Sequence, residues 1–376
     1  MLLGASGFTG GLTAEYLAGH AGATRWALAG RNRAKLEAVR DRLGVDVPLL
    51  IADVTDEESI RRVAESARVV ITTVGPYIHY GEPVVAACAA AGTDYVDLTG
   101  EPEFVDLMWL RYQEQAERTG ARLVHSCGFD SIPYDLGALY TVQQLPENAA
   151  IRLEGFVRVG GTFSGGTYHS AVHILGRLRQ ARSAAAERRR LEPRPPGRRI
   201  RGITPLPHHD DTAGGWVLPV PTIDPITVLR SARALDRYGP DFTYAHYLVA
   251  KRWPALAGLV GGAAGVTALA QLPPTRDLLL KLRDPGEGPS SEQRAKGWFK
   301  VRFKGETDGR SLITEVTGGD PGYGETSKMV AESALCLAHD DLPDRAGQVT
   351  PAVAMGQALI DRLTRAGIGF QTTETS

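Results

Sequence analysis

The chain has 376 residues, enough for two domains with separate hydrophobic cores. Its formal net charge of −1 at pH 7 gives no general attraction to nucleic acid, so no nucleic-acid partner is expected. The three cysteines lie far apart and form neither a metal-binding pair nor a disulfide framework, which indicates a reducing cytoplasm. The nine histidines are scattered, so no metal site is predicted.

The first ten residues predict the end of a β-strand and a glycine-rich turn into a helix, with the spacing G-x-x-G-x-x-G. In a Rossmann fold such a turn brings a nucleotide pyrophosphate to a helix N-terminus, whose free N–H groups and partial positive charge bind it. The alternative is an ordinary glycine-rich turn. The residues predicted to bind the cofactor here are Gly4, Ser6, Gly7, Phe8, Thr9 and Gly10.

The first predicted strand is short. Only three residues precede Gly4, whereas strands usually have about five. We therefore expect the natural protein to carry several residues before Met1, which would complete this strand.

The end of the second predicted strand, residues 26–30, selects between NAD and NADP. NAD-binding Rossmann folds carry Asp or Glu there, whereas this chain has Gly30 followed by Arg31. A guanidinium binds a ribose 2′-phosphate through charge-assisted hydrogen bonds, and a carboxylate would repel it. The sequence therefore predicts NADP(H), held by Arg31. Arg33 and Lys35 either assist or belong to a solvated helix start.

Further strands alternate with helical segments, as in a doubly wound α/β fold with a parallel sheet. These strands are predicted at residues 47–53, 69–76, 94–98 and 122–128. Open α/β sheets bind ligands at the carboxyl ends of their strands, which places Val74, Gly75 and Pro76 beside the cofactor. Asp53 either contacts the adenine amino group or, with Thr55, caps the following helix.

Several motifs carry a family resemblance that spans nearly the whole chain. They lie at residues 4–10, 28–31, 74–77, 80–85, 95–101, 127–133, 164–167 and 319–323. The chain resembles the saccharopine dehydrogenase-like oxidoreductases, and most closely the actinobacterial branch of trans-acting enoyl reductases of complex-lipid biosynthesis. The resemblance implies an NADP-dependent reductase with a Rossmann domain and a second, substrate-binding domain.

The second half of the chain departs from the strand–helix alternation. Apolar and polar residues alternate at 151–159, 298–303 and 311–316, as in strands with one solvated face. We predict a Rossmann domain over 1–135 and an α+β substrate domain over 136–320. In 321–376 we predict two helices, roughly Glu325–His339 and Pro351–Ala366, which return to the Rossmann domain, as the resemblance implies. The glycines before Thr167 either form a second anion-binding helix start or a simple hairpin turn.

Two segments bear on the substrate. Residues 177–201 contain ten arginines and two glutamates, a pattern that could dock an acidic carrier protein or a membrane surface, or could be a solvated helix end and loop. Residues 253–275 carry no charge up to Thr275 and could in length span a bilayer, but their Gly, Ala and Pro content favours a buried helix hairpin. Between a membrane-spanning helix and a buried hairpin lies a third possibility, in which this segment touches a membrane surface or lines the site of an acyl chain.

Reduction by NADPH requires an acid that protonates the hydride acceptor. Candidates near the nicotinamide are the following residues: Tyr77, His79, Tyr80, Cys127 and Asp130, with Tyr168 and His169 from the second domain. Tyr77, Tyr80 and Asp130 are the catalytic residues predicted, although Asp130 could instead cap a helix that begins at Ile132. Tyr247 and Lys251 match a Tyr-x-x-x-Lys pair but lie outside the nucleotide domain, so we interpret the match as coincidence.

The sequence therefore predicts an NADPH-dependent reductase of a hydrophobic, lipid- or polyketide-derived substrate, most simply an enoyl reductase. The protein is expected in the cytoplasm, where it could also bind peripherally at the inner face of the plasma membrane. A homodimer is one of the oligomeric states that the sequence allows. The alternatives are a saccharopine-type amino-acid reductase and a lipid-associated binding protein with a structural NADPH.

Overall fold

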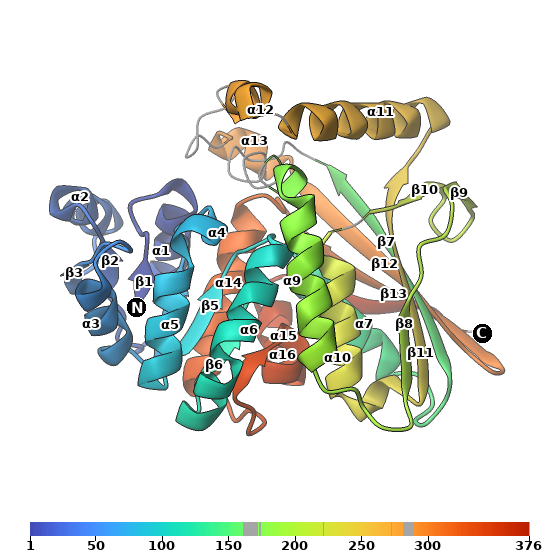
Figure 1. Cartoon of the computed structure of the whole chain (residues 1–376), viewed down its shortest axis with the longest axis horizontal. Coiled ribbons are helices and arrows are strands. Elements are labelled where there is room, and N and C mark those ends of the chain that lie inside the picture. The colour runs from blue at the N-terminus through green and yellow to red at the C-terminus, as the bar shows by residue number, and fades with distance from the viewer. Residues whose placement is uncertain (161–171, 173, 221, 272, 281–288, 376) are drawn as a thin grey trace.

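The computed structural model describes residues 1–375 apart from 161–171, 173, 221, 272 and 281–288. Two sheets lie side by side, one formed mainly by the N-terminal third and one by the remainder (Figure 1). The predicted fold class, a doubly wound parallel sheet with a second α+β domain, is confirmed.

The first sheet is parallel, with seven strands in the order β14-β6-β5-β4-β1-β2-β3. Its strands are β1 (Leu2–Leu3), β2 (Leu28–Gly30), β3 (Leu49–Ile51), β4 (Val69–Thr72), β5 (Asp94–Asp97), β6 (Arg122–Val124) and β14 (Gly347–Val349). The strands after β1 are shorter than predicted because most of their last residues leave the ladder as loops. Those loops form the carboxyl edge of the sheet, where the candidate site lies.

Helices cover both faces of this sheet, and strands such as β4 and β5 are accordingly buried at every residue. One face carries α1 (Phe8–His20), α2 (Arg33–Leu43) and α14 (Gly324–His339), and the other carries α3 (Glu57–Glu65), α5 (Glu82–Ala91) and α6 (Pro102–Thr119). The short α4 (Tyr77–Tyr80) follows β4. Helix α14 lies against α1, so the C-terminal part of the chain returns to the first domain.

The second sheet is mixed, with the order β15-β13-β12-β7-β11-β10-β9 and β8 beside β11. Its strands are β7 (Ile151–Gly160), β8 (Arg199–Gly202), β9 (His208–Asp210), β10 (Gly215–Pro219), β11 (Asp241–Ala250), β12 (Trp298–Thr307), β13 (Arg310–Gly318) and β15 (Gly369–Thr375). Helices α7 (Ile132–Val142) and α10 (Asp224–Ala234) pack on it, while α9 (Leu178–Leu191) lies along α6. The short η1 (Asp236–Tyr238) and α13 (Ser291–Ala295) lie in connections.

The end of the chain differs from the predicted pair of helices. The predicted helix over 351–366 is interrupted, giving α15 (Pro351–Ala354) and α16 (Gly356–Arg365), because Gly356 has a positive φ of 46°. Strand β15 then joins the second sheet beside β13. Its Thr-rich sequence suits an exposed edge strand but carries no apolar alternation that would have revealed it.

The uncharged segment forms α11 (Trp253–Ala270), followed by α12 (Pro273–Leu280). The two helices contact each other, but the expectation that they are buried is wrong. Trp253 is 51% exposed and Leu269 is 45% exposed. A helix built largely of Gly and Ala has few large side chains with which to form a core. In the described part of the chain, no helix is long and apolar enough to cross a membrane.

The arginines of the Arg-rich segment are largely bound within the fold, rather than free as both interpretations assumed. Arg177 pairs with Glu103 at 2.7 Å, and Arg188 is only 4% exposed. Arg198 donates to backbone carbonyls at the end of α10, and Arg201 pairs with Asp241. Much of the positive charge of this segment therefore holds α9 and β8 in place.

Candidate functional site

The glycine turn joins β1 to α1 with no room for larger residues. Gly4 has a positive φ of 89°, and a Cβ on Gly10 would lie 2.1 Å from the Gly4 carbonyl oxygen. A Cβ on Gly7 would meet only that same oxygen, at 3.3 Å. Helix α1 begins after Gly7 without a side-chain cap and without an acid in its first turn. Its first N–H groups are therefore available to an anion.

The end of β2 presents Arg31 without a neighbouring carboxylate on the same strand end. Arg31 is exposed, and its charge contributes to a lowered pKa of Asp53 at the end of β3. The main cause of that lowered pKa is the pair of hydrogen bonds that the Asp53 carboxylate accepts from Thr55. Helix α3 is capped by Asp56, so the helix cap does not need Asp53. Arg33 forms a surface pair with Glu37, and Asn32 caps α2.

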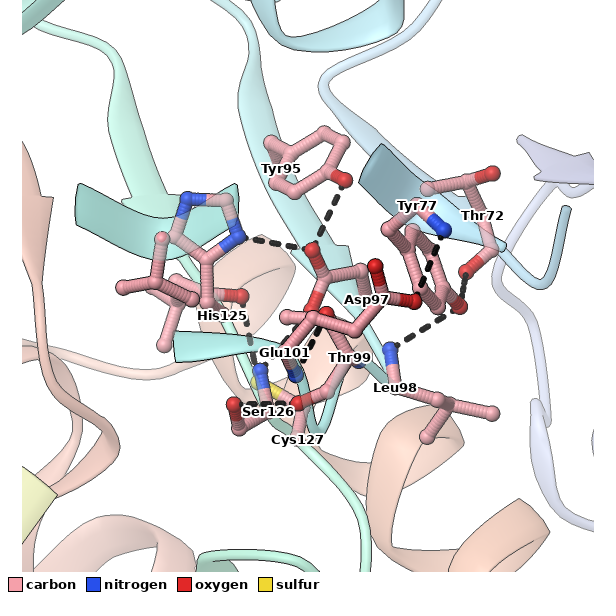
Figure 2. A network of polar contacts seen from close by, with 12 residues as sticks. Thr72, Tyr77, Tyr95, Asp97, Leu98, Thr99, Glu101, His125, Ser126 and Cys127 are labelled. Carbon is pink, nitrogen blue, oxygen red and sulfur yellow. Dashed lines mark hydrogen bonds and ion pairs between the residues drawn. The ribbon is translucent and has the colours of Figure 1, made fainter. Parts of the chain in front are cut away.

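The loop after β4 is fixed by a carboxylate from the next strand. Glu101 accepts hydrogen bonds from the backbone N–H groups of Tyr77 and Ile78, at 3.0 and 2.9 Å (Figure 2). The Tyr77 hydroxyl donates to the carbonyl of Thr72 and accepts from the N–H of Leu98. Burial raises the pKa of Tyr77 well above its usual value. These contacts hold the Val74–Gly75–Pro76 segment, whose Gly75–Pro76 bond is cis, at the carboxyl edge.

Asp97 connects the ends of β5 and β6. Its carboxylate accepts from the Tyr95 hydroxyl at 2.8 Å, from Nδ1–H of His125 at 2.6 Å, and from the N–H groups of Thr99 and Ser126 (Figure 2). Asp97 is fully buried. Four contacts of this kind around one buried side chain fix the two loops that carry the site residues.

Asp130 and Asp224 form an acidic pair where the two domains meet. A Cβ on Gly100 would lie 3.1 Å from Oδ2 of Asp130, so this carboxyl group lies against the loop after β5. The Asp130 side chain is open to solvent, yet its surroundings desolvate it and raise its pKa to about 6. Burial, and then the charge of Asp130, raise the pKa of Asp224 well above its usual value.

The remaining neighbours of Asp224 are neutral. Its Oδ2 accepts from the Thr222 hydroxyl at 2.6 Å and lies 3.8 Å from Nε2 of His246, whereas Oδ1 has no partner among the described residues. Burial lowers the pKa of His246 to about 3, so its ring is neutral at pH 7. Within the described part of the chain, no cation contributes to the pKa of either Asp130 or Asp224. Both shifts make the two carboxyl groups bind their protons more readily than they would in water.

The other candidates lie in different settings. Tyr80 is 43% exposed at the end of α4, next to His79. Cys127 is buried, and its thiol donates to the carbonyl of Val124. Tyr247 faces Glu154 in the second sheet, with the hydroxyl 3.3 Å from the carboxylate. Tyr168, His169 and the glycines before Thr167 lie outside the described residues.

Sequence reasoning missed Asp97, Glu101, His125, Asp224 and His246. Asp97 and Glu101 lie inside one of the family motifs, which was the available signal for them. Asp224 and His246 lie more than 90 residues from Asp130 in sequence and have no local motif, so only the tertiary structure brings them together. In the described residues, no group of His, Cys, Asp and Glu could hold a metal ion.

Comparison with known proteins matches residues 1–124 to the saccharopine dehydrogenase NADP-binding domain. A Mycobacterium tuberculosis protein provisionally named a trans-acting enoyl reductase is 39% identical, over 99% of this chain and 97% of its own length. The trans-acting enoyl reductase of Mycobacterium ulcerans is 35% identical, over 99% of this chain and 97% of its own length. Saccharopine dehydrogenase (L-Glu forming) of Saccharomyces cerevisiae shares the fold, with a TM-score of 0.55, 14% identity and 99% of both chains covered.

These matches agree with the geometry of the cofactor site. The uncapped start of α1, the open side of Gly7 and the exposed Arg31 fit the pyrophosphate and 2′-phosphate of NADP(H), which is the cofactor. The protein is therefore an NADP-dependent oxidoreductase, as the sequence predicted. The chain belongs to the saccharopine dehydrogenase-like oxidoreductases, in the branch of the trans-acting enoyl reductases.

Proposed function

We propose that this oxidoreductase reduces the carbon–carbon double bond of a hydrophobic, lipid- or polyketide-derived enoyl substrate. The bound cofactor supplies a hydride. An enoyl group that accepts hydride at its β-carbon needs a proton at its α-carbon. We assign that proton to the carboxyl group of Asp130, whose pKa of about 6 lies near the working pH of a general acid.

The observation that carries this proposal is the acidic pair without a cation. The two carboxyl groups, when ionised, repel a substrate that itself carries several carboxylates, and the neutral His246 supplies no positive charge to offset this. A saccharopine-type amino-acid substrate would need cationic groups at this position. An uncharged acyl group meets no such penalty, so the acidic pair favours enoyl reduction.

We assign positioning roles to the other residues of the carboxyl edge. The Tyr77 hydroxyl already donates its proton to a backbone carbonyl, so it orients the loop with Glu101. Val74, Gly75 and Pro76 are proposed to lie beside the nicotinamide, and Asp53 near the adenine. Tyr80, with an exposed hydroxyl, is the second candidate proton donor.

A substrate presented by a carrier or a membrane is supported by two observations. Relatives at 35–39% identity are named trans-acting enoyl reductases, and a trans-acting enzyme receives its substrate from another protein. In addition, α11 exposes apolar side chains such as Trp253 beside the second domain. We propose that a hydrophobic acyl chain or its carrier contacts this side of the molecule, whereas the Arg-rich segment is mainly structural.

The test is NADPH oxidation by the purified protein with trans-2-enoyl thioesters of short and long chain. With 4-deuterated NADPH in ordinary water, deuterium should appear at the β-carbon of the product. In heavy water with unlabelled NADPH it should appear at the α-carbon. Turnover with an amino acid and a keto acid, but not with enoyl thioesters, would refute the proposal. Tight NADPH binding without turnover of either substrate class would favour the binding-protein alternative.

A further inference from the structure

A cavity, which we call the lateral pocket, is lined by residues of α6, α9 and α10 and of the edge strand β14. Its volume is about 650 Å³, within the range of sites for small molecules. None of the residues of the glycine turn lines it, nor does Asp130 or Asp224. The lateral pocket is therefore distinct from the cofactor and acid sites.

The floor of the lateral pocket contains an unsatisfied histidine nitrogen. His125 is 5% exposed, and its Nδ1 donates to Asp97, because that carboxylate only accepts (Figure 2). Its other ring nitrogen, Nε2, is buried and has no hydrogen-bond partner in the described chain. In the neutral ring, Nε2 is an acceptor held in a fixed direction by the Asp97 contact.

A second unsatisfied acceptor lies on the same face of the sheet. Gln348 is paired in register with Leu123, which is two residues before His125, so Gln348 and His125 share the face that α6 covers. The amide nitrogen of Gln348 donates to the carbonyl of Val105, which fixes the orientation of the amide. Its Oε1 is buried and has no partner among the described residues.

The wall formed by α9 and α10 is cationic. Arg188 and Arg230 share one carboxylate, that of Asp106, and Arg188 also pairs with Glu192. Arg233 lies one helical turn beyond Arg230 on α10 and lines the same pocket. The charges of Arg230, Arg194 and Arg189 add to burial in lowering the pKa of Arg233, although Arg189 and Arg194 do not line the pocket. On this wall, three lining guanidinium groups face the two carboxylates of Asp106 and Glu192.

The acidic residues at the outer end of the pocket already have partners. Glu114 lies 3.9 Å from Arg118, and Glu117 accepts from the amide of Gln113. Neither contributes to the pKa shift of Arg233. Asp106, which pairs with Arg188 and Arg230, directly follows Val105, whose carbonyl accepts from Gln348, so these arginines lie near that unsatisfied acceptor.

We propose that the lateral pocket binds a small phosphate monoester that carries a hydroxyl group. Its phosphate pairs with Arg230 and Arg233, and its hydroxyl donates to Nε2 of His125 or Oε1 of Gln348. This inference does not depend on the proposed enoyl reduction. A dianion suits the surplus of guanidinium groups, whose forked N–H donors match phosphate oxygens. The hydroxyl supplies what the floor lacks, since a buried acceptor without a partner costs free energy.

The experiment is a titration of the full chain, held at saturating NADPH so that the phosphate sites of the cofactor are filled. The probes are glycerol 3-phosphate, inorganic phosphate and glycerol. Binding is measured by calorimetry, and the ring nitrogens of His125 are followed by ¹⁵N NMR. We expect saturable binding of glycerol 3-phosphate, weaker binding of phosphate, none of glycerol, and a shift of the His125 Nε2 signal with glycerol 3-phosphate only.

Two variants and a matched control complete the test. Arg233→Gln should weaken glycerol 3-phosphate binding about tenfold or more. Gln348→Met, of similar size, should reduce the preference for glycerol 3-phosphate over phosphate. The control is Arg190→Gln, which removes an exposed arginine of the same helix as Arg188. It should change neither the affinity for glycerol 3-phosphate nor the preference for it over phosphate. Absence of saturable binding by the wild type, or equal binding by Arg233→Gln, would overturn the assignment. So would binding of glycerol 3-phosphate that neither shifts the His125 signal nor loses its preference over phosphate in Gln348→Met.

Discussion

At the residue scale, Arg31 is expected to determine the preference for NADPH over NADH. It stands exposed at the end of β2, where the chain has no carboxylate for a ribose 2′-hydroxyl. Arg31→Ala should weaken NADPH binding by about 1.5–3 kcal/mol, the usual contribution of a hydrogen bond to a charged group, and leave NADH binding nearly unchanged. Fluorescence titration of both nucleotides measures the difference. Arg61→Ala, which removes another exposed arginine of the same domain, is the control.

Asp130 should set the pH dependence of turnover. A raised carboxyl pKa means that the folded protein binds this proton more readily than the unfolded chain does. The protonated acid is therefore lost as pH rises through about 6, and kcat should fall with it. Asp130→Asn should remove most of the activity at every pH, whereas Asp344→Asn, at an exposed site, should leave the profile unchanged.

The same substitution should have an opposite effect on stability. Above pH 6 the wild type holds a charge in a desolvating site, a cost that vanishes when the carboxyl group is protonated. Asp130→Asn should thus raise the melting temperature relative to the wild type at pH 8 and change it less at pH 5. An unchanged difference across this range would show that Asp130 titrates normally.

The residues of the site differ in how far the sequence could predict them. Gly4, Gly7, Gly10 and Arg31 follow one another at fixed spacing, because a strand, a turn and a helix impose that spacing locally. Asp224 has no such fixed spacing from the other site residues, since its role depends on how α10 approaches Asp130 from another domain. No local pattern distinguishes a carboxylate that caps a helix from one that meets a second carboxylate across a domain boundary.

At the scale of elements, the junction of β1 and α1 offers a matched pair of neighbouring glycines. A Cβ at position 10 would lie 2.1 Å from a backbone oxygen, whereas a Cβ at position 11 meets nothing closer than 3.6 Å. Gly10→Ala should therefore push α1 away from β1, costing about 3 kcal/mol or more of stability and most of the NADPH affinity. Gly11→Ala should be neutral or stabilise the helix by up to about 1 kcal/mol. Urea unfolding and nucleotide titration test both, and similar losses in the two variants would contradict this account.

The periodicity of apolar residues identified the helices and strands that pack against a core. It failed for elements that do not pack against one. The strands β4 and β5, which are buried along their whole length, were predicted within a few residues. The exposed edge strand β15 was not predicted, and α11 was predicted as a helix but wrongly as a buried one, because neither element has a buried face that constrains its sequence. The ends of strands were also overestimated, since an apolar loop at the carboxyl edge has the same composition as a strand.

At the scale of the whole molecule, β15 protects an edge of the second sheet. It pairs with β13 through six residues and brings Phe370 onto Tyr140, with ring centroids 5.9 Å apart. Truncation after Ile368 should cost about 2 kcal/mol from the lost burial of Phe370 and expose the edge of β13 to other chains. We expect a lower melting temperature and concentration-dependent association in sedimentation experiments. Phe370→Ser should lower stability without association, because the edge stays covered.

The positions of β14 and β15 also determine when the protein can fold during its synthesis. The edge strand of the first sheet, β14, pairs Gly347 with Arg122, and β15 completes the second sheet only at Thr375. A ribosome that has made the whole NADP-binding region has therefore not yet made a strand on which its sheet depends. Neither sheet has all its strands until residues 347–375 have been translated, so the two domains should reach their native state together and not one after the other.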